Sequence, residues 1–480
     1  MGDRFHISDW VLRLQVYRFG RDFDSPSPTA QGTIVAIYDI GCAVGSLVCF
    51  MFGQKLGRRR MIMLGASTML VGTAILTSAT TRAQLIVGRV VTGIGNGFNS
   101  SSIPVYQSET CEGRMRGALV CLNSTITILG LVIAYFLDYG LSFVNGPVQW
   151  RLPIGFQAFF ALFLLIQAAT LPETPRWLMS QGRKGEAIDV LSRLAAPPDQ
   201  RTPEVESLIQ ERLREIEESL ARESAGGPFR FAELLQGGPL GANMINYLAP
   251  VVYENTMGLS RNLSLILGGC TAITYFVASF IPLWTVDRFG RRALLMFSAT
   301  GLSTCFLLAA VLLSVSTKSA AYGATAMVFV FQIFLGIGFL PIPWLYPAEV
   351  SHTRIRAYTS AISSFVNWMC VFAVVEMTPP AIDQIGWRVF IIFAVLNACW
   401  VPIVYAFFPE TANLSLEDVD HLFEKGGITG GVWGAPGGRT VVAHSDHITG
   451  SAALRARNDE EKFDSTQSNI EHAEQTPAKH

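Results

Sequence analysis

A short charged loop occurs twice in this chain, about half a chain length apart. Gly57-Arg58-Arg59 follows one long apolar stretch, and Gly290-Arg291-Arg292 follows another, 290 − 57 = 233 positions later. Short charged loops repeated at matching places between apolar stretches indicate two homologous halves. This arrangement is typical of membrane transporters built from repeated units.

A second charged pattern is repeated in the same way. Glu109 precedes Arg114 and Arg116 by five and seven residues. Glu349 precedes Arg354 and Arg356 by the same five and seven residues. Both copies lie at the ends of apolar stretches, so the repeat extends over most of each half.

The composition indicates a membrane protein. Half of the 480 residues are hydrophobic and only 15% are charged, against about 25% charged in an average soluble chain. Stretches of about 20 apolar residues recur, which predicts an all-α polytopic membrane protein in contact with the lipid bilayer. The net charge of −1 gives no reason to expect a nucleic-acid partner.

We expect neither an enzyme nor a metal or cofactor site. The eight cysteines show no CxxC spacing, so we interpret them as small apolar residues rather than metal ligands. The sequence has no nucleophile elbow or phosphate-binding loop, and its Gly-rich stretch at 426–438 follows no predicted strand.

The spacing of the apolar stretches predicts five parts: a leader at 1–32, a helical bundle at 33–171, a polar linker at 172–239, a second bundle at 240–408 and a polar tail at 409–480. The first bundle should hold five spans. The second should hold five clear spans and a doubtful one at 240–257. The expected spans are 33–53, 61–80, 83–107, 117–138, 152–171, 240–257, 263–286, 293–315, 320–347, 357–378 and 386–408.

Basic residues predict the orientation. Eleven Lys and Arg residues fall in the loops at 53–60, 108–116, 287–292 and 351–356, and at most five fall in the alternating loops. Because basic loops face the cytoplasm, we expect these four loops, the linker and the tail to be cytoplasmic. The leader, with four arginines, would then lie outside. This conflict suggests that a helix before residue 33 is missing.

Seven motifs in order resemble the sugar porter family of the major facilitator superfamily. The residues in these motifs are most similar to those of fungal hexose and polyol porters. The resemblance covers residues 22 to 425. The motifs are Gly57-Arg58-Arg59, Gly88-Arg89, Pro104-Val105-Tyr106 with Glu109 and Arg114, Pro172 to Leu178, Asp287 to Arg292, Pro341 to Trp344 with Glu349, Arg354 and Arg356, and Pro409-Glu410-Thr411 with Leu416-Glu417. The resemblance implies the major facilitator fold, with two pseudo-symmetric helical bundles.

The resemblance also implies substrate-binding residues. Asn243 matches the family's Gly-x-Asn position, Trp344 the Trp after Pro-x-Pro, and Asn367 and Trp368 the Asn-Trp pair. Sugar hydroxyls need hydrogen-bonding partners and sugar rings stack on aromatic faces, which adds Asn246 and Tyr247. Ser124 stands where the family has a Gln in its fifth span. Core packing for Trp368 and an interhelical hydrogen bond for Asn367 are the alternatives.

The charged loops predict a gate. An unpaired Arg inside a span is costly, so we expect Arg89 to have a carboxylate partner on the cytoplasmic side. Glu109 and Glu349 stand beside arginines, and ion pairs there would hold the cytoplasmic ends of the two halves together. The alternative is that the arginines only set the topology. The expected gate residues are Arg58, Arg89, Glu109, Arg114, Arg116, Asp287, Arg288, Arg291, Glu349, Arg354 and Arg356.

The chain also departs from the family pattern. The family's first span, with its proton-coupling acid, has no match, and the Gln-Gln pair expected at Gly237 and Gly238 is absent. The apolar run at 240–253 is short for a span. We therefore expect about 10 to 11 spans, with the first missing and the seventh truncated.

These features predict a plasma-membrane transporter of a sugar or polyol that works by alternating access, with protons as the coupling ion that the resemblance implies. Two alternatives remain: a sugar receptor that signals through its tail, and an inactive truncated transporter.

Overall fold

The computed structural model describes residues 22–23, 28–111, 116–144, 146–195, 203–225, 261–315, 317–350 and 356–411. The chain divides into two compact units, Met1–Leu416 and Glu417–His480, and all described residues belong to the first. Every regular element among them is helical. The expected span at 240–257, the leader up to residue 21 and the tail beyond residue 411 lie outside the described residues, so the suspected loss of two spans stays an expectation.

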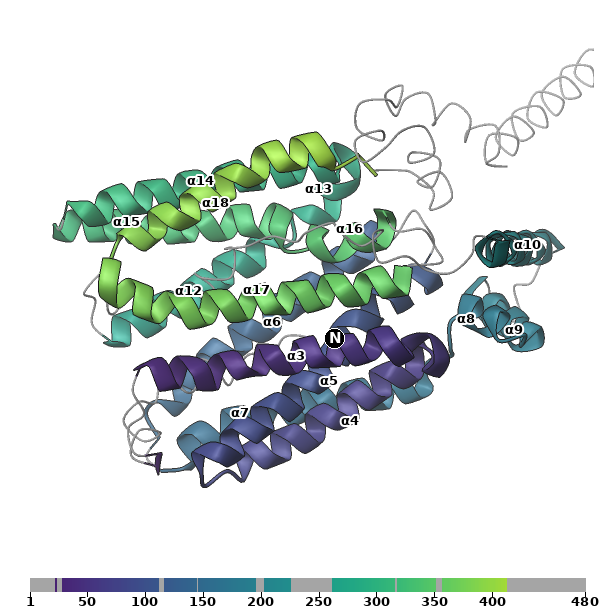
Figure 1. Ribbon diagram of the computed structural model, residues 1–480, viewed down its shortest axis with the longest axis horizontal. Coiled ribbons are helices and arrows are strands. Elements are labelled where there is room, and N and C mark those ends of the chain that lie inside the picture. The colour runs from purple at the N-terminus through teal and green to yellow at the C-terminus, as the bar shows by residue number, and fades with distance from the viewer. Residues whose placement is uncertain are drawn as a thin grey trace, which may run out of the picture. The chain divides into compact units, whose positions relative to one another are not determined.

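The first half of the fold is a bundle of five long helices (Figure 1). They are α3 (Pro28–Leu56), α4 (Arg58–Thr77), α5 (Arg82–Thr110), α6 (Arg116–Leu141) and α7 (Val148–Thr170). Thr81 caps α5 by accepting a hydrogen bond from the backbone N–H of Gln84 at 3.3 Å. Gly93 and Gly97 of α5 let its backbone approach α3, where an added Cβ would come within 2.3 Å and 2.2 Å of carbonyl oxygens.

The second half contains α12 (Arg261–Ala278), α13 (Pro282–Phe289), α14 (Arg291–Ser314), α15 (Lys318–Phe334), η5 (Leu335–Phe339), α16 (Ile342–Val350), α17 (Arg356–Ile385) and α18 (Arg388–Phe407). The expected span at 263–286 is bent by 46° between α12 and α13, just before Pro282, which cannot donate a backbone hydrogen bond. The expected span at 320–347 is interrupted by a π-helical turn, η5, followed by Pro341.

Eight described helical segments are long and apolar enough to cross a membrane, or nine if the bent pair α12–α13 is counted as one span. α5 is not among them, although it has 29 residues. Its buried face carries polar groups such as Arg89, Asn96 and Asn99, which lower its hydropathy. Because α5 packs extensively against α3 and α4, we interpret it as a further span that faces protein rather than lipid.

The two halves meet along α3 and α17, which lie side by side (Figure 1), and along α6 and α12. Between described residues, the hydrogen bonds found across this interface come from hydroxyl or indole groups. Thr33 Oγ1 donates to Glu376 Oε1 at 2.9 Å, and Thr125 Oγ1 donates to the carbonyl oxygen of Ser279 at 2.9 Å. The interface between the halves is therefore held by neutral donors and apolar packing.

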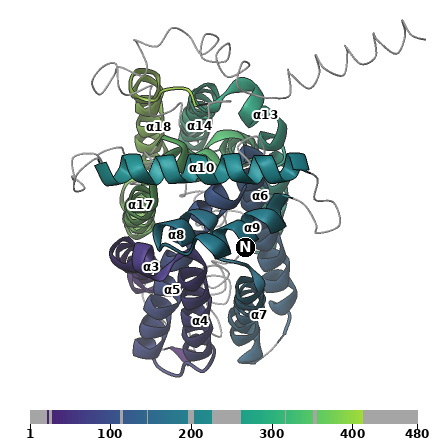
Figure 2. The ribbon, with the colours of Figure 1, turned by 90° about the vertical axis from the view of Figure 1, so that its right-hand side faces the viewer.

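The stretch expected as a polar linker carries three helices: α8 (Pro175–Ser180), α9 (Lys184–Ala195) and α10 (Pro203–Ala225). Figure 2 shows them across one end of the long helices. The indole of Trp177 fixes this position by donating to the carbonyl oxygen of Gln54, at the end of α3, at 2.8 Å. We call this end of the molecule, where α3 meets α4 and α13 meets α14, the linker end.

Candidate substrate cavity and charged clusters

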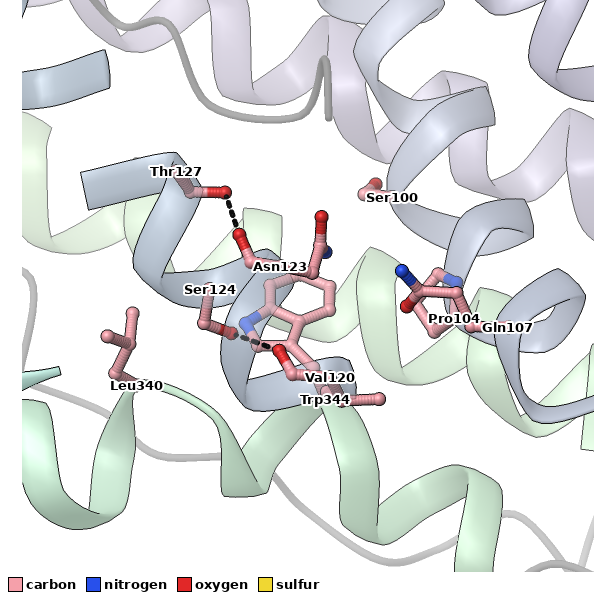
Figure 3. Close-up of a pocket in the computed structure, with 9 residues that line it drawn as sticks. All are labelled: Ser100, Pro104, Gln107, Val120, Asn123, Ser124, Thr127, Leu340 and Trp344. Carbon is pink, nitrogen blue, oxygen red and sulfur yellow. Dashed lines mark hydrogen bonds between the residues drawn. The ribbon is translucent and has the colours of Figure 1, made fainter. Parts of the chain in front are cut away.

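A cavity lies between the two halves (Figure 3). Its walls come from α5 and α6 in the first half and from the segment after η5 in the second. The empty space within it is about 430 Å³, a figure that includes its opening to solvent. The described lining residues are all uncharged: Ser100, Pro104, Gln107, Val120, Asn123, Ser124, Thr127, Leu340 and Trp344.

Trp344 reaches the cavity because of the break in its helix. The π-helical turn ends where the backbone N–H of Leu340 donates to the carbonyl oxygen of Leu335 at 3.0 Å. The helix restarts with the backbone N–H groups of Trp344 and Leu345 donating to the carbonyl oxygen of Pro341 at 3.2 Å and 3.1 Å. Irregular backbone at membrane depth is tolerated where it is buried in protein or lines a cavity. The structure places Trp344 on the wall of this cavity, and its part in substrate binding stays a prediction.

Of the other expected substrate residues that the structure describes, Ser124 lines the cavity, and Asn367 and Trp368 do not. Ser124 lines the cavity, but its hydroxyl donates to the carbonyl oxygen of Val120 at 3.1 Å. Trp368 is 1% exposed and packs in the interface between the halves, where its indole donates to Ser100 Oγ at 3.1 Å. This is the core-packing alternative, although Trp368 reaches the cavity wall indirectly through Ser100. Asn367 is partly buried on α17 and does not line the cavity.

Sequence reasoning missed two cavity residues that carry amide groups. Asn123 and Gln107 point into the same space from α6 and α5, near the indole of Trp344 (Figure 3). Asn123 stands in an Asn-Ser-Thr triplet inside a span, a glycosylation motif that cannot be used there. A usable signal existed, because Asn123 and Thr127, like Ser100, Pro104 and Gln107, recur at the spacing of one helix face.

A first charged cluster lies at the linker end of the first half. Arg58 Nη2 pairs with Glu109 Oε1 at 2.9 Å, with side chains only 8% and 3% exposed. Glu109 Oε2 accepts a hydrogen bond from Thr174 Oγ1 at 2.6 Å. Glu173 accepts the backbone N–H groups of Arg58 and Arg59 at 3.1 Å and 3.2 Å. The carboxylate thus caps the positive N-terminus of α4, where Gly57 has no side chain to do so.

A second cluster repeats this arrangement in the second half. Arg291 Nη2 pairs with Glu349 Oε1 at 2.8 Å, and its Nε donates to Glu349 Oε2 at 3.1 Å. Thr411 Oγ1 donates to Glu349 Oε2 at 2.7 Å. Glu410 accepts the backbone N–H groups of Arg291 and Arg292 at 2.8 Å and 3.0 Å, capping α14.

The two clusters correspond element by element. Gly57 and Gly290 have nearly the same backbone angles, with φ of 90° and 89°. Arg59 donates to carbonyl oxygens at the end of α7, and Arg292 donates to that of Tyr405 near the end of α18. One position differs. Asp287 pairs with Arg291 at 2.8 Å, where the first cluster has Gln54 accepting from Arg58 at 3.1 Å.

The structure corrects the expected role of these pairs. Among the described residues, the buried ion pairs join elements of one half, whereas the sequence argument had them joining the two halves. The reason is that each Arg begins the helix next to the one that ends with its Glu. The halves approach at this end at Gly117 of α6, where an added Cβ would come within 2.8 Å of Asp287 Oδ1, and at the ring contact between Phe50 and Tyr358.

Arg89 is also placed differently from the expectation. It is 1% exposed and lies with its guanidinium 5.9 Å from the ring centroid of Tyr38. It stands 109 − 89 = 20 residues before Glu109 on α5, or about 30 Å along the helix. Arg89 is therefore far from the linker end and does not belong to either cluster.

The remaining expected site residues are either exposed or lie outside the described part of the chain. Arg288 is exposed beside the ring of Phe289, and no ion pair joins it to a described residue. The side chains of Arg116 and Arg356, at the starts of α6 and α17, lie outside the described part of the chain. So do Asn243, Asn246, Tyr247, Arg114 and Arg354, and these stay predictions. No group of three or more potential metal ligands occurs among the described residues.

Residues 12–423 match the Sugar (and other) transporter family. The chain belongs to this family. It is 36% identical to the MFS-type transporter oryC of Aspergillus oryzae over 413 residues, covering 82% of this chain and 77% of that protein. It is also 36% identical to the sugar transporter STL1 of Saccharomyces cerevisiae over 425 residues, covering 84% of this chain and 74% of that protein.

The fold of this sugar transporter family member is that of a solved relative. The proton:xylose symporter XylE, bound to 6-bromo-6-deoxy-D-glucose, superposes with a TM-score of 0.76 at 22% identity, covering 88% of this chain and 96% of XylE. The expected major facilitator fold is confirmed. The two repeated clusters are then the matching ends of its two bundles.

Proposed function

We propose that this protein carries a sugar or polyol across a membrane by alternating access. The observation that carries the proposal is a cavity at the interface between two matched helical halves, with no charged residue in its described lining and with Trp344 on its wall. The indole supplies an apolar face for a sugar ring or carbon chain, and the amides and hydroxyls around it suit hydroxyl groups.

The charged clusters support a rigid-body mechanism. In alternating access, two halves rock against each other about a central site. Each half must then keep its own helices together while the interface between the halves changes. The buried ion pairs and helix caps lie within each half, and the interface has single hydrogen bonds from neutral donors. The strong contacts are therefore in the parts that should stay rigid.

Proton coupling and location belong to the same proposal. XylE is a proton:xylose symporter, and we propose that this chain also uses a proton gradient. We further propose that it resides in the plasma membrane, with the linker end and the C-terminus in the cytoplasm. The basic residues of its loops support this orientation.

Purified protein in liposomes tests the proposal. Radiolabelled glucose, xylose, sorbitol and glycerol are offered with and without an inward proton gradient. We expect uptake of at least one of them above empty liposomes, increased by the gradient. Equal uptake with and without the proton gradient would contradict proton coupling but not transport. Absence of uptake for all neutral sugars and polyols would contradict transport itself.

A further inference from the structure

The hydroxyl groups of the cavity already have partners. Ser100 Oγ accepts from the Trp368 indole at 3.1 Å and shares a hydrogen bond with Ser364 Oγ at 2.9 Å. Ser124 donates to the carbonyl oxygen of Val120 at 3.1 Å, and Thr127 donates to that of Asn123 at 3.0 Å. These groups give the cavity its shape and have little donor capacity left for a ligand.

The two amides differ from the hydroxyls in this respect. Gln107 Oε1 is buried and accepts no hydrogen bond. The side chain of Asn123 is partly buried, and its amide forms no hydrogen bond with any residue that the structure describes. A buried polar atom left unpaired, such as Gln107 Oε1, costs about 1–3 kcal/mol, and such atoms in a native protein call for an explanation. The amides come from adjacent helices and point into one cavity (Figure 3).

We propose that Gln107 and Asn123 form an amide clamp that binds two hydroxyl groups of the substrate while Trp344 covers its apolar face. Together the two amides offer two acceptor oxygens and four N–H donors, which matches neighbouring hydroxyls, since each hydroxyl both donates and accepts. The clamp belongs to the first half and Trp344 to the second. A bound substrate therefore contacts both halves.

The clamp also defines the class of substrate. No described residue that lines the cavity is charged. A carboxylate placed there would lose its hydration without gaining a cation from any described residue of the lining, which costs several kcal/mol. The clamp therefore favours an uncharged compound with at least two neighbouring hydroxyls over a hydroxylated acid.

This inference rests on the proposed function, and equilibrium binding in lipid nanodiscs tests it without transport. The probes are the neutral compound with the highest uptake, its deoxy analogues and the acid quinate. Gln107→Met and Asn123→Leu remove each amide at similar volume, and Gln107→Asn and Asn123→Gln retain an amide. Gln167→Leu, a matched change on α7 outside the cavity, is the control, and all variants are compared for yield and monodispersity.

We expect each apolar variant to weaken binding of the neutral probe about tenfold, the effect of one lost hydrogen bond, with smaller losses for the amide-retaining variants and none for the control. A deoxy analogue that lacks the clamped hydroxyl should bind the unaltered protein more weakly and show no further loss in one of the two variants. Quinate should not compete.

Failure of the clamp, of the substrate class and of the proposed function would give different results. A protein that binds and transports a neutral probe, but whose affinity is unchanged by Gln107→Met and Asn123→Leu, overturns the clamp and leaves the transport proposal standing. Quinate binding as tight as that of the neutral probe overturns the substrate class. Absence of binding for every neutral probe overturns the proposed function and the clamp together.

Discussion

Arg291 and Glu349 form a two-bond ion pair at the linker end, with Nη2–Oε1 at 2.8 Å and Nε–Oε2 at 3.1 Å and both side chains less than a tenth exposed. It has a counterpart in Arg58 and Glu109, and each pair ties together helices of one half. Glu349→Gln removes the charge that neutralises Arg291 while Asp287 remains. We expect the unfolding free energy to fall by about 2 kcal/mol, seen as a lower melting temperature in detergent.

The exposed Arg288, which pairs with no described residue, supplies the control for that experiment. Arg288→Gln should leave the melting temperature unchanged. If Glu349→Gln melts at the same temperature as the unaltered protein, the ion pair does not hold the second half together.

We expect the thermal stability of the protein to require glycine at positions 290 and 57. Both have φ near +90°, and an added Cβ would lie 2.3 Å from Glu410 Oε2 or 2.5 Å from Glu173 Oε2. Gly→Ala at either position combines backbone strain of about 1–3 kcal/mol at positive φ with displacement of the carboxylate that caps the next helix. Lower thermal stability is expected for both variants.

Gly185→Ala on α9 is the matched control, because a Cβ there meets nothing within 4 Å. It should be neutral or slightly stabilising, since Ala favours a helix. Equal melting temperatures for Gly290→Ala and Gly185→Ala would show that the turn tolerates a side chain.

Gly117 should control how closely the halves approach at the linker end. A Cβ there would meet Asp287 Oδ1 at 2.8 Å, so Gly117→Leu should push α6 and α13 apart. Spin labels at Lys55 on α3 and Phe289 on α13, both exposed, in a cysteine-free background report the separation of the two halves by pulsed electron resonance. We expect a longer mean distance in Gly117→Leu.

Gly140→Leu changes the same helix at a position with nothing within 4 Å and should leave the distance distribution unchanged. A distribution in Gly117→Leu that matches Gly140→Leu would mean that this contact does not set the separation of the halves.

Trp344 should determine affinity through its aromatic face. Trp344→Ala removes the stacking surface, and we expect at least a tenfold rise in the substrate concentration that gives half-maximal uptake. Trp344→Phe, which keeps a smaller ring, should lie in between. Trp284→Ala, at a Trp that is 70% exposed on α13, should behave as the unaltered protein. An order of effects that does not follow ring size would contradict stacking.

Much of the fold could be predicted from the sequence, because each span is a long apolar stretch bounded by charged loops. Repetition of those loops also indicated the two halves and brought Arg58 and Glu109, and Arg291 and Glu349, to attention. The bend before Pro282 and the π-helical turn before Pro341 could not be predicted in position, since they depend on packing against neighbouring helices.

The candidate site was harder to predict, because hydropathy identifies a helix but not which of its faces meets the other half. Trp344 was found through the prolines around it. Gln107 and Asn123 were missed because single amides in a span are also common in packing contacts. Glu173 and Glu410 were visible as repeated motifs, yet their role as caps of α4 and α14 depends on contacts more than 100 residues away in the chain.

Counterflow in liposomes tests the central claim most directly. Liposomes containing the purified protein are loaded with an unlabelled neutral sugar or polyol, and entry of the labelled compound is followed without any ion gradient. Alternating access through the cavity predicts transient accumulation of label, which Trp344→Ala reduces and Trp284→Ala does not. Correctly folded protein that shows no counterflow with any neutral sugar or polyol would contradict the account.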